Sequence, residues 1–243
     1  MTPYGTEFLE HVNRALEELE NGKQVMSQMK RPDLGTINLV YATSMGLNYI
    51  PGLISSFYAD GANQNIKINF EQRHTRAIAD LLDKGIIDLG FGSHVDDKTV
   101  SCYAVYAENM VMAVPRNHPL AGRKRISLED VAAEKLITFD HNCNIRKAID
   151  EIYEHAGIRP DIAYEVSNEI MVTGIVATGI GVGIVPLIKG MDYRNVKTLE
   201  IEGCSSLRPM YMMREKDGLL MPAAERFRDF VIEMAEKGNP FLA

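Results

Sequence analysis

Short polar side chains recur where the sequence predicts that a strand ends and a helix begins. Together with the adjacent Met45, these candidate binding residues are Thr43, Ser44, Arg73, His74, Thr75, Ser93, His141, Asn142, Cys143, Ser167 and Asn168. At the start of a helix the backbone N–H groups lack intrahelical partners, and the helix dipole favours negative charge. Four such helix starts that converge on one cleft would bind a small anion, such as a carboxylate, sulfate or phosphate.

Each of these residues alone has a simpler interpretation. Ser, Thr and Asn cap helices in every fold, so a single cap is more often structural than functional. The case for binding rests on several caps from two halves of the chain meeting at one place. Arg73, Arg76 and Arg146 lie near the same turns and are candidates to pair with an anion. His74 and His141 fit the lining of a cleft better than the role of a general base.

The sequence gives little support for catalysis or for a bound cofactor. It contains no GxSxG elbow, no P-loop, no HExxH and no GxGxxG after a first strand. The glycines of GIGVGIVP (179–186) are expected to permit tight turning and close packing instead of cradling phosphate. The six histidines lack metal-ligand spacing. We therefore expect no enzymatic activity, no cofactor and no metal.

Composition argues against several other classes. The net charge is −7, from 33 acidic and 26 basic residues, whereas a domain that grips DNA phosphates is usually basic. Cys102, Cys143 and Cys204 form no CxxC pair, so neither a disulfide framework nor a zinc knuckle is expected, and a reducing cytoplasm fits best. The N-terminal segment lacks the apolar core of a secretory signal, and no stretch has the length and apolarity of a membrane span.

Alternating strand and helix patterns begin at residue 35. The first set has strands at 36–42, 66–70 and 86–92 and helices at 45–60 and 74–84. This βαβαβ order predicts a parallel sheet, and residues 104–115 read as two further strands. After a basic connection at 115–127, the second set has strands at 135–139, 162–166, 181–186, 195–200 and 208–213 and helices at 142–156, 168–178 and 220–236. The fold class is α/β with two similar lobes, whose strand ends face a cleft.

A long helix precedes the α/β pattern. Thr2 can cap its start, and Pro3 suits the first helical position. Apolar residues then recur at spacings of three and four, at Phe8, Val12, Ala15, Leu16, Leu19, Met26 and Met29. Such a seam packs either on its own domain or on a second subunit. Because the segment lies outside the α/β pattern, we favour pairing with a second subunit through Phe8, Val12, Ala15, Leu19 and Met26.

Several segments resemble the LysR-type transcriptional regulators, in order and at matching spacing. TPYGTEF (2–8) is similar to the start of the family's linker helix, and GTINLVYA (35–42) to its first sensor strand. The long segment 49–91, with Leu81–Gly85 and the IDL of 87–89, resembles the family's next helix–strand–helix–strand unit. The remaining similar segments are PRNHPLAG (115–122), RISLEDVAAEKLITF (125–139) and VATGIGVGIVP (176–186).

This resemblance implies a two-lobed, periplasmic-binding-protein-like (type 2) fold behind a linker helix. The implied units are a linker and dimerisation helix at 1–30, a first lobe from 35–114 with 214–243, and a second lobe at 115–213. A small-molecule effector, with a carboxylate or an inorganic anion as candidates, would bind the cleft at the polar turns named above. The family also forms homodimers or homotetramers and binds DNA through an N-terminal winged helix-turn-helix. Residue 1 already stands at the linker helix, so DNA binding is expected only through a domain that this sequence lacks.

Other interpretations stay open at this point. Peroxide-sensing family members carry a reactive cysteine where Cys143 stands, and a helix start with Arg146 nearby would lower its pKa. Those sensors have a second cysteine one short helix away, which is absent here, so a pocket-lining thiol is the alternative. A solute-binding protein of a transporter, an enzyme on the same fold and a purely structural dimer are the remaining candidates.

Overall fold

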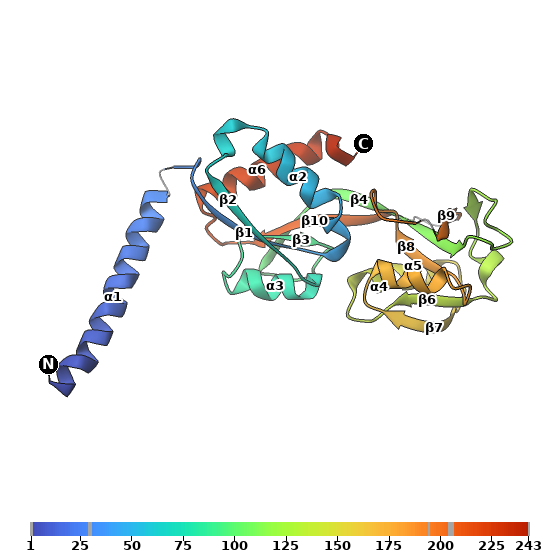
Figure 1. Cartoon of the computed structure of the whole chain (residues 1–243), viewed down its shortest axis with the longest axis horizontal. Coiled ribbons are helices and arrows are strands. Elements are labelled where there is room, and N and C mark those ends of the chain that lie inside the picture. The colour runs from blue at the N-terminus through green and yellow to red at the C-terminus, as the bar shows by residue number, and fades with distance from the viewer. Residues whose placement is uncertain (1, 29–30, 194, 204–206, 243) are drawn as a thin grey trace.

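The predicted alternation of strands and helices builds two α/β lobes, seen in a computed structural model that describes residues 2–28, 31–193, 195–203 and 207–242 (Figure 1). Lobe I is built on the parallel strands β1, β2 and β3, in the order β2-β1-β3. Its elements are β1 (Gly35–Tyr41), α2 (Tyr49–Tyr58), β2 (Ile66–Gln72), α3 (Thr75–Asp83), β3 (Leu89–Gly92) and α6 (Pro222–Glu236). The mixed α/β class expected from the sequence is confirmed.

Lobe II repeats the strand–helix theme on a smaller scale. Its elements are β5 (Arg125–Ile126), β6 (Lys135–Phe139), α4 (Asn144–His155), β7 (Asp161–Val166), α5 (Glu169–Val176), β8 (Gly183–Pro186) and β9 (Val196–Ile201). Strands β6 and β7 run parallel, and a bridge between Leu136 and Val182 connects them to the start of β8. Short 3-10 turns occur at Thr43–Gly46, Gly61–Asn63, Glu129–Val131 and Pro240–Leu242.

Two long antiparallel strands run from one lobe into the other. β4 (Val100–Pro115) and β10 (Leu207–Glu215) pair from Val100–Glu215 to Asn109–Leu207. The prediction of two strands in 104–115 is wrong, because the polar pair Glu108-Asn109 continues a single strand. Glu108 lies opposite Arg208 in the ladder, and the carbonyl of Asn109 accepts the N–H of Leu187 at 2.7 Å.

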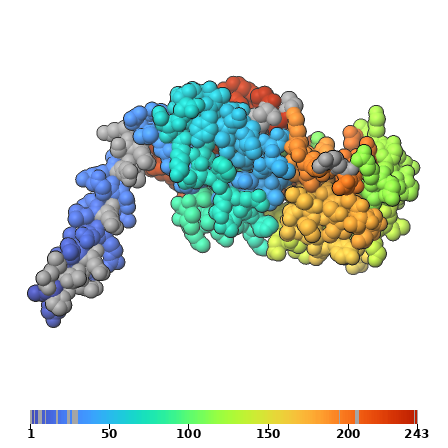
Figure 2. All heavy atoms as spheres, viewed as in Figure 1, coloured from blue at the N-terminus to red at the C-terminus, as the bar shows by residue number. Residues whose placement is uncertain are grey.

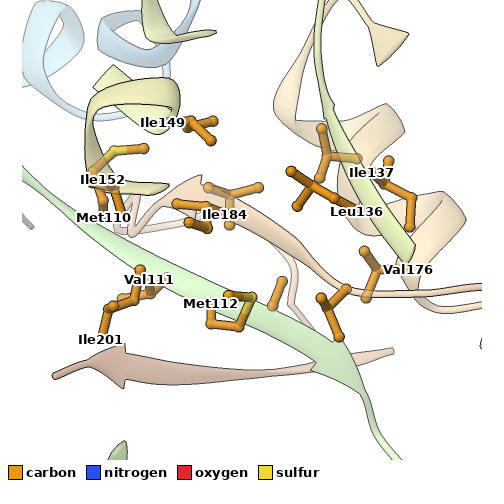
Figure 3. Close-up of a cluster of buried hydrophobic side chains, with 14 of the residues drawn as sticks. Met110, Val111, Met112, Leu136, Ile137, Ile149, Ile152, Val176, Ile184 and Ile201 are labelled. Carbon is orange, nitrogen blue, oxygen red and sulfur yellow. The ribbon is translucent and has the colours of Figure 1, made fainter. Parts of the chain in front are cut away.

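Each lobe has its own hydrophobic core. The lobe II core includes Met110 and Met112 of β4, Ile149 of α4 and Ile184 of β8, and Figure 3 shows such side chains gathered between β4, β6, β8 and α4. The lobe I core includes Val105 of β4 and Met210 and Met212 of β10. Residues of β4 therefore contribute to both cores, and the change from the lobe I core to the lobe II core occurs within this strand. The division expected at 114/115 and 213/214 lies a few residues from that change and stays a prediction.

The glycine-rich segment 179–186 serves packing, as its sequence indicates. A Cβ at Gly183 would lie 2.7 Å from a side-chain carbon of Val172 on α5. A Cβ at Gly181 would lie 2.1 Å from the carbonyl oxygen of Lys135. Both approaches let β8 lie close to α5 and β6, so the expectation of close packing at these glycines is confirmed.

Helix α1 (Pro3–Gln28) stands apart from both lobes (Figures 1 and 2). The hydroxyl of Thr2 accepts the N–H of Gly5 at 3.2 Å, which confirms Thr2 as the cap and Pro3 as the first helical residue. The apolar seam is open, with Phe8 70% and Leu19 64% exposed, and Met29 lies outside the described residues. Within the described part of the chain, no helix is long and apolar enough to cross a membrane.

Candidate functional site

A small cavity lies where the two lobes meet. Its volume is about 40 Å³, the space of one or two water molecules. Residues of both lobes line it: Ala42, Thr43, Ser44, Arg73, His74, Thr75, Phe139, Cys143, Asn144, Ile145, Ser167, Glu169 and Arg208. The strand ends of β1, β2, β6 and β7 thus meet at one place, as expected for open α/β sheets.

The lobe I wall is made by the turns after β1 and β2. Thr43 and Ser44 form a 3-10 turn in place of the expected start of a long helix, and the hydroxyl of Thr43 accepts a hydrogen bond from the Gln72 amide at 3.1 Å. Thr75 begins α3, and its Oγ1 accepts the N–H of Ser93 at 3.3 Å. A Cβ at Gly92 would lie 2.6 Å from that Oγ1. The absence of a side chain at Gly92 therefore lets the first turn of α3 reach the cavity.

The lobe II wall is made by the first turn of α4 and the turn after β7. Cys143, Asn144 and Ile145 line the cavity at the start of α4. The carboxylate of Asp140 accepts the N–H of Asn142 at 2.8 Å and so fixes the turn before the helix. Cys143 is buried, and its thiol donates to the carbonyl of Ser167 at 3.4 Å. The two lobe II turns are therefore held together by a direct contact.

The chemistry of Cys143 differs from that of a reactive thiol. Burial, reinforced by the negative charge of Asp140, raises the pKa of Cys143 to about 11. Arg146, expected to lower that pKa, donates instead to Asp150 at 2.7 Å, Glu165 at 2.5 Å and the Phe139 carbonyl at 2.8 Å. That guanidinium lowers the pKa of Glu165. Thiol-based sensing through Cys143 is therefore disfavoured, since a thiolate is the reactive species.

A buried ion pair lies at the base of the cavity. Arg208 of β10 donates to Glu108 of β4 at 2.7 Å and to the hydroxyl of Ser93 at 2.5 Å. The side chains of Arg208 and Glu108 are 8% and 3% exposed. Tyr106 also donates to Glu108, at 3.1 Å. The ion pair therefore joins the two long strands, and both of its side chains are buried.

The candidate binding residues predicted from the sequence do not include six residues that line the cavity: Ala42, Phe139, Asn144, Ile145, Glu169 and Arg208. Glu169 is the first residue of α5 and is only 7% exposed. Its burial raises the pKa of its carboxyl group, and the charge of Glu108 acts in the same direction. An acid in the first turn of a helix looks like an ordinary favourable dipole contact. The usable signals were charged residues inside otherwise apolar strands, Glu108 in 100–115 and Arg208 in 207–215.

Several predicted residues lie near the cavity without lining it. Met45 is fully buried in the lobe I core, so it supports the turn from behind. Asn168 caps α5 by accepting the N–H of Met171 at 3.0 Å, and Ser93 holds Arg208. The Asn142 N–H donates to Asp140, and the side chain of His141 is 73% exposed and lies 3.6 Å from Glu165.

Arg73, by contrast, lines the cavity, although its guanidinium pairs with Glu71.

The chain matches known regulators along most of its length. The family model described as the LysR substrate binding domain matches residues 30–236. The chain is 29% identical to the uncharacterized HTH-type transcriptional regulator YybE of Bacillus subtilis (strain 168), over 96% of this chain and 79% of that protein. It is 25% identical to the transcriptional dual regulator GltC of the same bacterium, over 98% of this chain and 80% of that protein.

Solved structures agree in fold. The effector binding domain of QuiR in complex with shikimate superposes with a TM-score of 0.80 at 28% identity, covering 84% of this chain and 98% of that one. The BenM effector binding domain with its effector benzoate shares the fold with a TM-score of 0.73 at 21% identity, covering 84% and 94%. YybE and GltC are both transcriptional regulators. The chain therefore belongs to the LysR family, and residues 30–236 form the effector-binding domain of a transcriptional regulator.

Proposed function

We propose that this domain senses a small anionic metabolite, a carboxylate or an inorganic anion, that bridges the two lobes. The observation that carries the proposal is the shared lining of one cavity by Ser44 and Thr75 of lobe I and by the first turn of α4 and Ser167 of lobe II. The similarity to QuiR, whose domain was solved with shikimate, supports a carboxylate as the ligand class.

Hydrogen-bond donors predominate on these walls. The N–H groups of the first two residues of α3 and of α4 have no intrahelical partners, whereas those of Ala77 and Arg146 already donate to the carbonyls of His74 and Cys143. Both helix dipoles favour negative charge at this end. The hydroxyl groups of Ser44 and Ser167 add neutral donors that turn toward an oxygen ligand. Such groups satisfy the oxygen atoms of an anion without a dedicated cation, because Arg208 is already paired with Glu108.

Binding of a bridging ligand favours the arrangement in which the lobes approach each other. β4 and β10 connect the lobes as one antiparallel ladder, so a movement of one lobe about these strands changes the width of the cleft. A ligand that contacts both walls shifts the population toward the closed form. A coupling of about 1–3 kcal/mol is enough for regulation.

The regulated output requires assembly beyond one chain. We propose that the open seam of α1 pairs two subunits through Phe8, Val12, Ala15, Leu19 and Met26, that the protein acts in the cytoplasm, and that DNA is bound through a separate N-terminal domain. Sedimentation velocity tests the pairing. Leu19→Asp is expected to lower the association state, whereas Asn13→Asp, off the seam on the same helix, is expected to leave it unchanged. Equal behaviour of the two variants would contradict pairing through α1.

A ligand panel tests the sensing proposal. The panel contains sulfate and phosphate, the plain carboxylates propionate, succinate and cyclohexanecarboxylate, and their hydroxyl- or amine-bearing counterparts lactate, alanine, malate, aspartate and shikimate. A binder at a hundred times its Kd stabilises the fold by about 2.7 kcal/mol, and each kcal/mol raises Tm by about 2–4 °C for a chain of this size. No shift with any member would contradict the proposal.

Variants of the lobe I wall locate the site. Thr43→Val with Ser44→Ala removes two hydroxyl groups from the cavity lining, and each lost hydrogen bond to a charged group costs about 1.5–3 kcal/mol. We expect calorimetric affinity for the panel's tightest member to fall at least about tenfold. Ser55→Ala, at an exposed position on α2, is the control and is expected to bind normally. Unchanged affinity in the double variant would place the ligand elsewhere.

A further inference from the structure

Glu169 is the one acidic side chain that lines the cavity among the described residues, and it has little to bind within the protein. Apart from its own backbone N–H, its carboxyl group has no hydrogen-bond or ion-pair partner in the described part of the chain. Acidic side chains are almost never this buried without a partner, because an unpaired buried polar group is costly. The position therefore calls for an explanation that the fold itself does not supply.

Arg208, the nearest cation of the cavity, does not neutralise Glu169. Its guanidinium is held by Glu108 at 2.7 Å and by Ser93 at 2.5 Å, although its charge still acts on Glu169. Both buried carboxyl groups thus feel the charge of one buried guanidinium, which pairs with Glu108 and not with Glu169. The two acids repel each other, which raises the pKa of Glu169 beyond the effect of burial alone. One hydrogen-bond acceptor of the cavity consequently remains to be satisfied from outside.

The cavity has donors and an acceptor on different residues. Donors come from Ser44, Thr75, Ser167 and the first turn of α4, as described above. Glu169 is the acceptor, and it lies at the first turn of α5 beside Cys143 and Arg208. Glu169 and the donor turns line the same cavity, so a ligand that binds the donors there lies beside Glu169. A plain anion would leave that carboxyl group without a donor and would be repelled by it when it is ionised.

We propose that Glu169 contacts the ligand and selects anions that carry a neighbouring hydroxyl or ammonium group over plain anions. This inference rests on the proposed sensing function and narrows its ligand class to hydroxy acids and amino acids. The anionic end of the ligand binds the donor turns, and its hydroxyl or ammonium group donates to Glu169. Inorganic phosphate and sulfate, as well as unsubstituted carboxylates, are then weak ligands.

The matched members of the panel test this selection directly. In the unmodified protein, each substituted ligand should bind at least about tenfold tighter than its plain counterpart, since one added hydrogen bond to a charged group is worth about that factor. The comparisons are lactate or alanine with propionate, malate or aspartate with succinate, and shikimate with cyclohexanecarboxylate. Glu169→Leu is expected to remove the difference within each set. Glu169→Gln keeps a neutral acceptor, so it should keep the preference for a hydroxyl group. Its preference for an ammonium group should weaken, because the charge of the carboxylate is lost. Glu154→Gln and Glu154→Leu, at an exposed acid of α4, should behave as the unmodified protein.

A measurement without ligand guards against a merely structural role. If Glu169 is retained for binding, Glu169→Leu replaces a buried, poorly paired acid with an apolar group and should leave Tm unchanged or raise it. A lowered Tm would show that the carboxyl group supports the fold and would overturn the inference.

The outcomes of the panel separate the two proposals. Equal binding of plain and substituted anions, or a preference that survives Glu169→Leu, overturns the role of Glu169 while anion sensing stands. No binding of any panel member overturns anion sensing and the selection by Glu169 together.

Discussion

The two walls of the cavity are built from the same kind of turn but differ in how their polar groups are used. On the lobe I wall, Thr43 and Thr75 each accept one neutral hydrogen bond from lobe I, from Gln72 and Ser93. On the lobe II side, Arg146 is bound by Asp150 and Glu165, and Arg208 at the base is bound by Glu108. The guanidinium groups nearest the cavity are therefore paired with acidic side chains. The cavity itself is lined by neutral donors and by the carboxyl group of Glu169, which has no side-chain partner among the described residues.

Under the proposed function, this difference explains how a closing cleft would recognise an anion without holding a free buried cation. Unpaired buried charges are costly, whereas first-turn amides and hydroxyl groups remain hydrated in the open form and lose little on closure. In this account the ion pairs at the base and behind α4 hold the walls in place, and the donor groups of the walls bind the ligand. Substitutions at the base should accordingly lower the stability of the fold strongly, whereas substitutions at the walls should lower it moderately.

The largest effect is expected at the base. Arg208→Met leaves Glu108 buried without its partner and should lower the free energy of unfolding by about 3–5 kcal/mol. Arg208→Met with Glu108→Leu should recover most of that loss, because an apolar pair of similar volume replaces the ion pair. Arg125→Met breaks an exposed pair with Glu200 and should cost at most about 1 kcal/mol. Urea unfolding measures all three, and a double variant as unstable as the single one would contradict this account.

A smaller effect is expected from crowding the lobe I wall. Gly92→Ala places a Cβ 2.6 Å from Oγ1 of Thr75, so the first turn of α3 must move. Overpacking of this kind costs about 1–3 kcal/mol, and panel affinity should fall with it. Gly122→Ala, where a Cβ meets nothing within 4 Å, is the matched control for thermal unfolding and calorimetry. Normal binding in Gly92→Ala would mean that the ligand does not use the start of α3.

The lobe II cap should show a still smaller loss. Asn168→Ala removes the acceptor for the N–H of Met171 and should lower stability by about 1 kcal/mol, the usual value of a helix cap. Asn168→Asp keeps an acceptor and should retain stability in the same thermal unfolding experiment. Because Asn168 does not line the cavity, Asn168→Ala should bind the panel normally, and a tenfold loss of affinity would contradict its role as a cap alone.

The sequence predicted the positions of the turns better than their chemistry. Thr43, Ser44, Thr75, Cys143 and Ser167 could be found because strand ends and helix starts are local patterns, and open α/β sheets bring such ends together. The pairing of Glu108 with Arg208 joins residues 100 positions apart, and only the register of β4 and β10 reveals it. The contacts of Arg146 with Glu165 and with the Phe139 carbonyl are also tertiary features, although its pair with Asp150 on the same helix is local. The sequence alone therefore left this guanidinium available for a ligand or for the thiol.

The same limit explains the prediction for Cys143. Position at a helix start is visible in the sequence, and so is Asp140 three residues earlier, whereas burial of the thiol against Ser167 is not.

The last prediction concerns the reactivity of Cys143, which is expected to be low. In a Cys102→Ser and Cys204→Ser background, the rate of iodoacetamide labelling should keep rising about tenfold per pH unit from pH 7 toward pH 9, since the thiolate fraction grows until the pH reaches the pKa of about 11. A labelling rate that is already constant at neutral pH would indicate a thiolate and would revive a redox role.

Amide hydrogen exchange tests most directly whether one ligand is held by both lobes. With the panel's tightest member at saturation, exchange should slow at the start of α3 (75–77) and at the start of α4 (144–146) together, while α1 is unaffected. Slowing in a single lobe, or in neither, would contradict a ligand that bridges the cleft.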